Sequence, residues 1–243
     1  MNESDPVVSD TSDSPILVAL DLPSAEEAVR MARSLAPHVG GFKVGLELLM
    51  GPGPAVVAAV AELGKPVFCD AKLHDIPNTV EHAARQVGRL GARWLTVHAG
   101  GGEAMMTAAV TGFSAGAGGR EVGILAVTVL TSLDAAALTS TGVGATPGRQ
   151  VARLAKLAAN AGVEGVVCSV KELGDVAQVA PHLLKVTPGV RPVGADVGDQ
   201  ARVATPEEAI ARGADLLVIG RPITRAADPV AAAAEIAASI RGR

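Results

Sequence analysis

The stretch ILVALD at residues 16–21 is a short, β-branched apolar run that ends in an acidic residue. Seven runs of similar composition follow it along the chain: GFKVGL (41–46), VFCDAK (67–72), WLTVHA (94–99), VGILAVTV (122–129), GVVCSV (165–170), LLKVTPG (183–189) and DLLVIG (215–220). The runs recur roughly every 28 residues, close to the length of a strand plus a crossover helix in a βαβ unit. The spacing therefore predicts eight strands that alternate with helices.

The segments between these runs carry helix signals. Ser24 and Glu27 have the spacing of a capping box at the start of a helix over 24–36, and Thr205 and Glu208 repeat that spacing. Alternating strands and helices imply a parallel sheet, and eight strands without a ninth favour a closed barrel over an open doubly wound sheet. We predict an α/β fold, a single-domain (β/α)8 TIM barrel over residues 15–243 that follows a flexible acidic tail over residues 1–14.

Charge and composition exclude several classes of partner. The first 14 residues contain four acidic residues and no Lys or Arg, and the remaining acidic and basic residues balance. This balance leaves no basic patch for a phosphate backbone, and one Trp, three Phe and no Tyr leave few side chains on which bases could stack. We therefore expect no nucleic-acid partner. The longest run without a charged residue, 104–119, is shorter than the ~20 residues of a membrane span.

The N-terminus predicts a compartment, and the cysteines argue against a metal or redox site. The first residues have neither the basic nor the apolar region of a secretory signal, so we expect a cytoplasmic protein. Cys69 and Cys168 lie in apolar runs without a CxxC or a zinc-finger spacing, so we expect buried thiols and no metal site.

The third run carries the richest set of polar residues. In a barrel, functional side chains lie at the carboxyl ends of the strands. Side chains alternate along a strand, so Asp70 and Lys72 are expected to share a face with Phe68, and Asp75 follows just beyond the strand. Two interpretations stay open for this segment taken alone. It could form an active site, or Asp70 and Lys72 could be a structural ion pair while Asp75 caps the next helix.

Other predicted strand ends carry matching polar residues, which favours the active site. Asp21 ends the first run, Lys43 lies in the second and Thr131 follows the fifth. Gly220 and Arg221 close the eighth, where a guanidinium and close backbone approach suit a phosphate group.

The segment DAKLHDIPNT (70–79) resembles the signature of the orotidine 5′-phosphate decarboxylase family. Further matching segments span the predicted barrel: ALD (19–21), FKVG (42–45), VTVLTS (127–132), VTPGVRP (186–192), DQAR (199–202) and VIGRPI (218–223). The resemblance implies cofactor-free decarboxylation of orotidine 5′-monophosphate (OMP) to uridine 5′-monophosphate (UMP). It assigns to Lys72 the stabilisation of the carbanion at C6 and its protonation. Two flanking carboxylates, Asp70 and Asp75, favour the charged ammonium that a proton donor needs.

The resemblance also implies roles for the remaining site residues. Asp70 lies against the substrate carboxylate, and Lys43 and Asp75 complete an alternating charged array. The phosphate is bound by the groups Arg191, Gln200, Gly220 and Arg221, and the segment 188–202 is expected to form a mobile lid. Asp21 and Lys43 bind ribose hydroxyls, and Thr131 contacts the pyrimidine. The family is homodimeric, with Asp75 and Thr79 reaching into the partner subunit's site.

Two alternatives remain at this point. Magnesium-dependent sugar-phosphate decarboxylases and synthases share the barrel and the DxKxxD motif, but they carry an acidic residue at the position of Lys43, where a lysine repels a cation. The second alternative is a non-catalytic barrel that only binds a nucleotide, and such a protein would not need the charged array.

Overall fold

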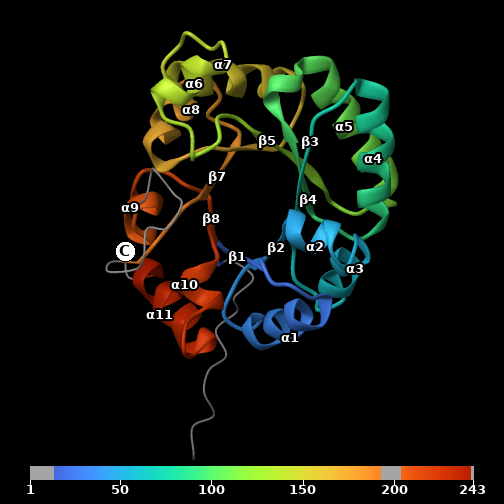
Figure 1. Ribbon diagram of the computed structural model, residues 1–243, viewed down its shortest axis with the longest axis vertical. Helices are drawn as coiled ribbons and strands as arrows, with labels where there is room; N and C mark the ends of the chain where they lie inside the picture. Colours follow the sequence, from blue (N-terminus) through green and yellow to red (C-terminus); the bar gives the residue numbers. More distant parts are fainter. Residues whose placement is uncertain (1–13, 193–203, 242–243) are drawn as a thin grey trace, which may run out of the picture.

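The computed structural model describes residues 14–192 and 204–241, and within them eight strands close into a parallel barrel (Figure 1). The strands pair in chain order, and β8 returns to pair with β1. Their bounds are β1 Ile16–Ala19, β2 Gly41–Val44, β3 Val67–Leu73, β4 Trp94–His98, β5 Gly123–Val127, β6 Gly165–Val167, β7 Leu184–Pro188 and β8 Leu216–Ile219. Each predicted run contains one strand, so the predicted (β/α)8 barrel is confirmed. The predicted tail over 1–14 lies almost entirely outside the described residues and stays a prediction.

The helices form a ring around the barrel (Figure 1). Their bounds are α1 Ala25–Leu35, α2 Leu46–Met50, α3 Ala55–Ala61, α4 Pro77–Arg89, α5 Glu103–Ala117, α6 Ala135–Ser140, α7 Pro147–Asn160, α8 Leu173–Val179, α9 Pro206–Ala211, α10 Arg221–Thr224 and α11 Pro229–Arg241, with 3-10 turns at Ala99–Gly101 and Val170–Glu172. Thr205 and Glu208 form the predicted capping box of α9. At α1 the side chain of Ser24 accepts from the backbone N–H of Glu27, which is one half of the predicted box.

Two apolar clusters hold the barrel together. The larger one fills the layer between the strands and the helices. The smaller one lies among the inward-facing side chains and includes Leu17, Phe68, Trp94, Leu125 and Val186. Parallel strands covered on both faces bury both sets of alternating side chains, which explains the near-continuous apolar runs of the sequence.

A charged cluster lies at the amino-terminal end of the barrel. Trp94 donates from Nε1 to Glu164 Oε1 at 3.1 Å, and the guanidinium of Arg93 binds both carboxylate oxygens of Glu164 at 2.7 and 2.8 Å. These residues lie at the start of β4 and just before β6. In barrels of this kind functional sites open at the opposite end, at the carboxyl ends of the strands.

Helices α4 and α5 pack with their backbones in close contact. A Cβ added at Gly112 would collide with the carbonyl oxygen of Glu81, and one at Gly116 with that of Arg85. Helix α4 begins two residues after Asp75, so this tight contact also anchors the loop that follows β3. None of the helices in the described ranges is both long and apolar enough to cross a membrane.

Candidate active site

A cavity of about 590 Å³ opens at the carboxyl ends of the strands. Its volume lies within the range of small-molecule sites. Inward-facing residues of most strands form its floor, and the loops after β1, β2, β5, β7 and β8 form its walls. The barrel therefore provides one concave site at the end where the sequence pattern predicts the chemistry.

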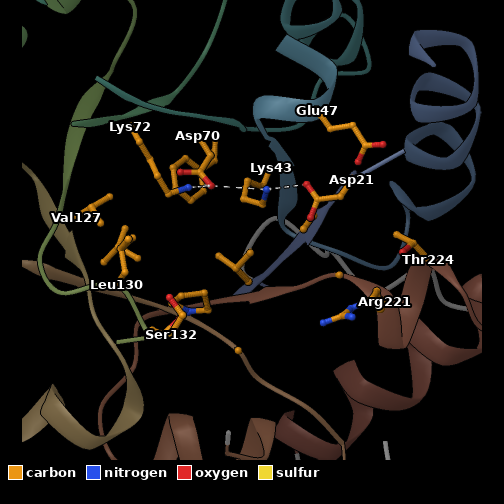
Figure 2. A pocket seen from close by; sticks show the side chains of 18 of the residues that line it. Asp21, Lys43, Glu47, Asp70, Lys72, Val127, Leu130, Ser132, Arg221 and Thr224 are labelled. Atoms are coloured by element: carbon orange, nitrogen blue, oxygen red, sulfur yellow. Dashed lines mark hydrogen bonds and ion pairs between the residues drawn. The ribbon is translucent and has the colours of Figure 1, made fainter. Parts of the chain in front are cut away.

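Four charged side chains of alternating sign form a row along this cavity (Figure 2). Lys72 Nζ lies 2.6 Å from Asp70 Oδ2, and Lys43 Nζ lies 3.6 Å from the same oxygen. On its other side Lys43 Nζ donates to Asp21 Oδ1 at 2.9 Å. Lys43 and Asp70 are buried, with exposed fractions of 9% and 8%. Buried charges are stable only when they are paired, and here each one faces an opposite charge.

Asp70 is held in its ionised form by its neighbours. Burial raises its pKa, but the ammonium groups of Lys43 and Lys72, with hydrogen bonds from Lys72 and Thr96, lower the pKa further, so the net direction is downward from 3.8. The adjacent Cys69 responds in the opposite way: burial, and then the charge of Asp70, raise the pKa of its thiol to about 12. Asp70 is thus a carboxylate at neutral pH, while Cys69 remains a neutral thiol and an unsuitable nucleophile.

Strand β3 reaches this geometry through an irregular backbone. The strands β3 and β4 are in register at Cys69 opposite Leu95 and again at Leu73 opposite Val97, so β3 contains two more residues than β4 between these points. Lys72 lies in this bulge with a φ of 50°, and it is the one non-glycine residue with positive φ in the described chain. Phe68, Asp70 and Lys72 all line the cavity, as the predicted shared face requires, but the bulge and not regular alternation brings the two charged groups together.

Asp75 and Thr79 lie outside the cavity of the single chain. Both are exposed, and neither lines the cavity. Asp75 Oδ1 accepts from the N–H of Ile76 at 2.6 Å, and the described residues show no ion pair between Asp75 and Lys72. Ile76 is the N-cap of α4 and Pro77 its first residue, so Asp75 is not the helix cap.

Three of the predicted phosphate-binding residues and the predicted pyrimidine contact also line the cavity. Gly220 directly precedes α10, Arg221 begins it, and Figure 2 shows the guanidinium of Arg221 across the cavity from Asp70 and Lys72. Arg191, after β7, is buried with an exposed fraction of 7%, and Thr131 follows β5. Gln200 and most of the predicted lid lie outside the described residues.

Sequence reasoning missed four polar residues of the cavity wall, namely Glu47, Ser132, Thr224 and Arg225. Glu47 follows β2 in α2, Ser132 lies in the loop after β5, and Thr224 and Arg225 lie at the end of α10. Their position in loops after strands was visible in the sequence, but single polar residues in such loops have no pattern that separates them from ordinary surface residues.

Residues 14–236 match the family described as "Orotidine 5'-phosphate decarboxylase / HUMPS family". The chain belongs to this family. It is 58% identical over 226 residues to the orotidine 5′-phosphate decarboxylase of Anaeromyxobacter sp. (strain K), covering 93% of this chain and 97% of that relative. It is 56% identical over 229 residues to the one from Thermobifida fusca (strain YX), covering 93% and 96%. The crystal structure of orotidine 5′-phosphate decarboxylase from Lactobacillus acidophilus aligns with a TM-score of 0.83 at 38% identity, covering 95% of this chain and 100% of that one.

Membership of the orotidine 5′-phosphate decarboxylase / HUMPS family confirms the resemblance predicted from the motifs. Within the ranges 14–192 and 204–241, no group of three or more His, Cys, Asp or Glu residues is arranged to hold a metal ion. The ammonium of Lys43 lies between Asp21 and Asp70, at 2.9 Å from Asp21 Oδ1 and 3.6 Å from Asp70 Oδ2.

Proposed function

We propose that this protein decarboxylates OMP to UMP without a metal or organic cofactor, and that Lys72 donates the proton to C6. The observation that carries the proposal is the contact of 2.6 Å between Lys72 Nζ and Asp70 Oδ2 on the wall of the cavity. The similarity to named orotidine 5′-phosphate decarboxylases over 93% of the chain supports the substrate and the reaction.

The chemistry asks for a cation beside the reacting carbon. When the bond from C6 to the carboxylate breaks, CO2 leaves and the electron pair stays on C6 in the plane of the ring, where no π system accepts it. A fixed ammonium stabilises this charge as it develops. Lys72 then transfers one proton from Nζ to C6, which gives UMP, and the neutral amine regains its proton from solvent.

Asp70 contributes in two ways to this proposal. Its carboxylate fixes the ammonium of Lys72, and it would lie against the substrate carboxylate, a like-charge contact that ends when neutral CO2 departs. Lys43, 3.6 Å away, keeps Asp70 ionised and links it to Asp21. Asp21 and Lys43 would bind the ribose hydroxyls, since a carboxylate accepts and an ammonium donates.

The far wall would bind the rest of the nucleotide. Arg221 and Arg191 would hold the phosphate, with backbone approach at Gly220, and Thr131 would contact the pyrimidine. Gln200 is assigned to the phosphate by the family resemblance. Binding energy gathered at the phosphate, away from C6, can hold the charged row in its reactive arrangement and lower the barrier at the reacting carbon.

The complete site would form in a homodimer, with Asp75 and Thr79 of each chain entering the partner's cavity. Support comes from their exposure in the single chain and from their absence from the lining of its own cavity. The neighbouring Ile76 is an apolar side chain with an exposed fraction of 66%, and Leu130, at the cavity wall, has one of 39%. Burial of these two side chains by a partner chain would remove apolar surface from water, which favours association. We also place the protein in the cytoplasm, which the buried thiols Cys69 and Cys168 support.

The two alternatives predict different behaviour in one assay. Purified protein is mixed with OMP in the presence of a chelator, and the ultraviolet absorbance of the orotate ring is followed. The proposal expects conversion to UMP at an undiminished rate. Activity that is lost on chelation and restored by Mg²⁺ would favour the metal-dependent relatives. Tight binding of UMP without any turnover would favour a non-catalytic nucleotide-binding barrel.

A further inference from the structure

We propose that Thr96 is a positioning residue for this reaction: its hydroxyl holds the carboxylate of Asp70 and the backbone of Lys72 in one fixed arrangement. This inference rests on the proposed decarboxylation, because it assigns to Thr96 the alignment of the groups that act on C6. Thr96 does not line the cavity, so it acts through its two neighbours and not on the substrate.

The hydrogen bonds of Thr96 are fully determined. Thr96 lies in the middle of β4 with an exposed fraction of 0%. The backbone N–H of Lys72 donates to Thr96 Oγ1 at 2.9 Å, and Thr96 Oγ1 lies 3.0 Å from Asp70 Oδ1. An ionised carboxylate only accepts, so the proton of the hydroxyl must point to Asp70. One side chain therefore satisfies a backbone donor and a buried charge at once.

The bulge in β3 explains why a side chain is needed at this point. Between the two points at which β3 and β4 are in register, residues 70–72 face the single residue Thr96. The N–H of Lys72 is turned to a side chain of β4 instead of a carbonyl group of the ladder. The left-handed φ of 50° at Lys72 is unfavourable for a lysine, and such conformations persist where surrounding contacts fix them. The hydrogen bond to Thr96 is such a contact.

The same hydroxyl also acts on the charge of Asp70. The ionisable groups that influence or contact Asp70 are Lys43 from β2, Lys72 and Cys69 from its own strand, and His98 from the end of β4. Hydrogen bonding from Thr96 is among the causes that lower the pKa of Asp70, after burial, which opposes it, and after the two lysines. Removing the hydroxyl is expected to raise the pKa of Asp70 and to remove the hydrogen bond that fixes the backbone of Lys72.

The test compares Thr96→Val, which keeps the shape and removes the hydroxyl, with Thr96→Ser, which keeps the hydroxyl. We expect Thr96→Val to lower kcat roughly 10- to 100-fold, the range for loss of one hydrogen bond to a charged group. The affinity for UMP should change less than about 3-fold, because the residues proposed to bind the phosphate follow β7 and β8, away from Thr96. The acid limb of the profile of kcat/KM against pH should move to higher pH, and Thr96→Ser should stay near the wild type.

Three outcomes would overturn the role of Thr96. One is a Thr96→Val enzyme with the kcat of the wild type, and another is a fall in kcat that Thr96→Ser reproduces. The third is a loss of UMP affinity in the same proportion as kcat, with an unmoved pH profile, which would mark a structural role. Thr96→Cys, of similar size and with a weaker hydrogen-bonding group, serves the same comparison if Thr96→Val does not fold. The wild type is assayed first. If it neither consumes OMP nor binds UMP, the proposed function itself is overturned, whatever the variants do.

Discussion

Lys72 Nζ lies 2.6 Å from Oδ2 of Asp70, two residues earlier on the same strand. In a regular strand the Cα atoms of such residues are roughly 6.6 Å apart, and their side chains stand parallel. The bulge in β3 and the left-handed backbone at Lys72 replace that regular geometry here. The contact is therefore built into the backbone, at a cost in conformational energy that the surrounding hydrogen bonds and ion pairs offset.

That cost can be measured by replacing Lys72. Lys72→Ala and Lys72→Gly both remove the ammonium, and both should abolish decarboxylation. Glycine adopts positive φ readily and alanine does not, so Lys72→Gly should be more stable than Lys72→Ala by about 1 kcal/mol. Urea unfolding of the two variants checks the difference. Near-normal turnover in either variant would remove Lys72 from the chemistry, and equal stability would contradict the left-handed backbone.

The sequence contains a clear local signal for the barrel and none for the bulge. The strands and the caps at Ser24 and Thr205 follow from local patterns, namely apolar runs at a regular spacing and polar side chains placed to accept from the backbone. The bulge depends on how β3 and β4 pair, and no Gly or Asn marks the positive φ at Lys72. For the same reason Thr96 looks like an ordinary β-branched strand residue, and its contacts appear only in three dimensions.

The phosphate site is tested by Arg221→Ala. Loss of charge-assisted hydrogen bonds to a phosphate should lower kcat/KM for OMP by about 2 to 3 kcal/mol, or roughly 30- to 150-fold. Arg153→Ala is the matched control, because Arg153 is an exposed residue of α7 that does not line the cavity. Steady-state kinetics of the two variants decide the point: an unchanged kcat/KM in Arg221→Ala would exclude Arg221 from the site.

The lowered pKa of Asp70 predicts how stability depends on pH. A carboxyl whose pKa is lower in the folded than in the unfolded state contributes stability above its unfolded pKa, and this contribution is lost as the pH falls through the folded pKa. The ordinary value for Asp70 is 3.8, and its neighbours lower it. The stability advantage of the wild type over Asp70→Asn should thus be full near neutral pH and shrink as the pH falls below about 4. Urea unfolding across this range measures it, and an advantage that grew towards acid pH would refute the assignment.

The close packing of α4 and α5 predicts a strong penalty for added side-chain volume. Gly112→Ala and Gly116→Ala each place a Cβ against a backbone carbonyl of α4, which cannot move without separating the helices. Each should lower the free energy of unfolding by about 1 to 3 kcal/mol. Gly174→Ala in α8 is the control, because its Cβ would meet nothing within 4 Å, and it should be neutral or slightly stabilising. Comparable losses at Gly174 and Gly112 would show that helix packing is not the cause.

The shared site can be tested by mixing two inactive variants. In a dimer of one Lys72→Ala chain and one Asp75→Asn chain, one site carries both changes, while the other combines the intact Lys72 of one chain with the intact Asp75 of its partner. Random pairing should restore about a quarter of wild-type activity, because half of the dimers are mixed and each has one intact site out of two.

The control pairs Lys72→Ala with Asp70→Asn. Asp70 and Lys72 contact each other within one chain, so each site of this mixed dimer carries one of the two changes and no activity should return. Recovery in the first mixture without recovery in the second requires Asp75 to act across an interface. If neither mixture recovers although the subunits exchange, Asp75 serves its own chain, and the loop after β3 would have to turn its carboxylate away from the N–H of Ile76 and into the cavity.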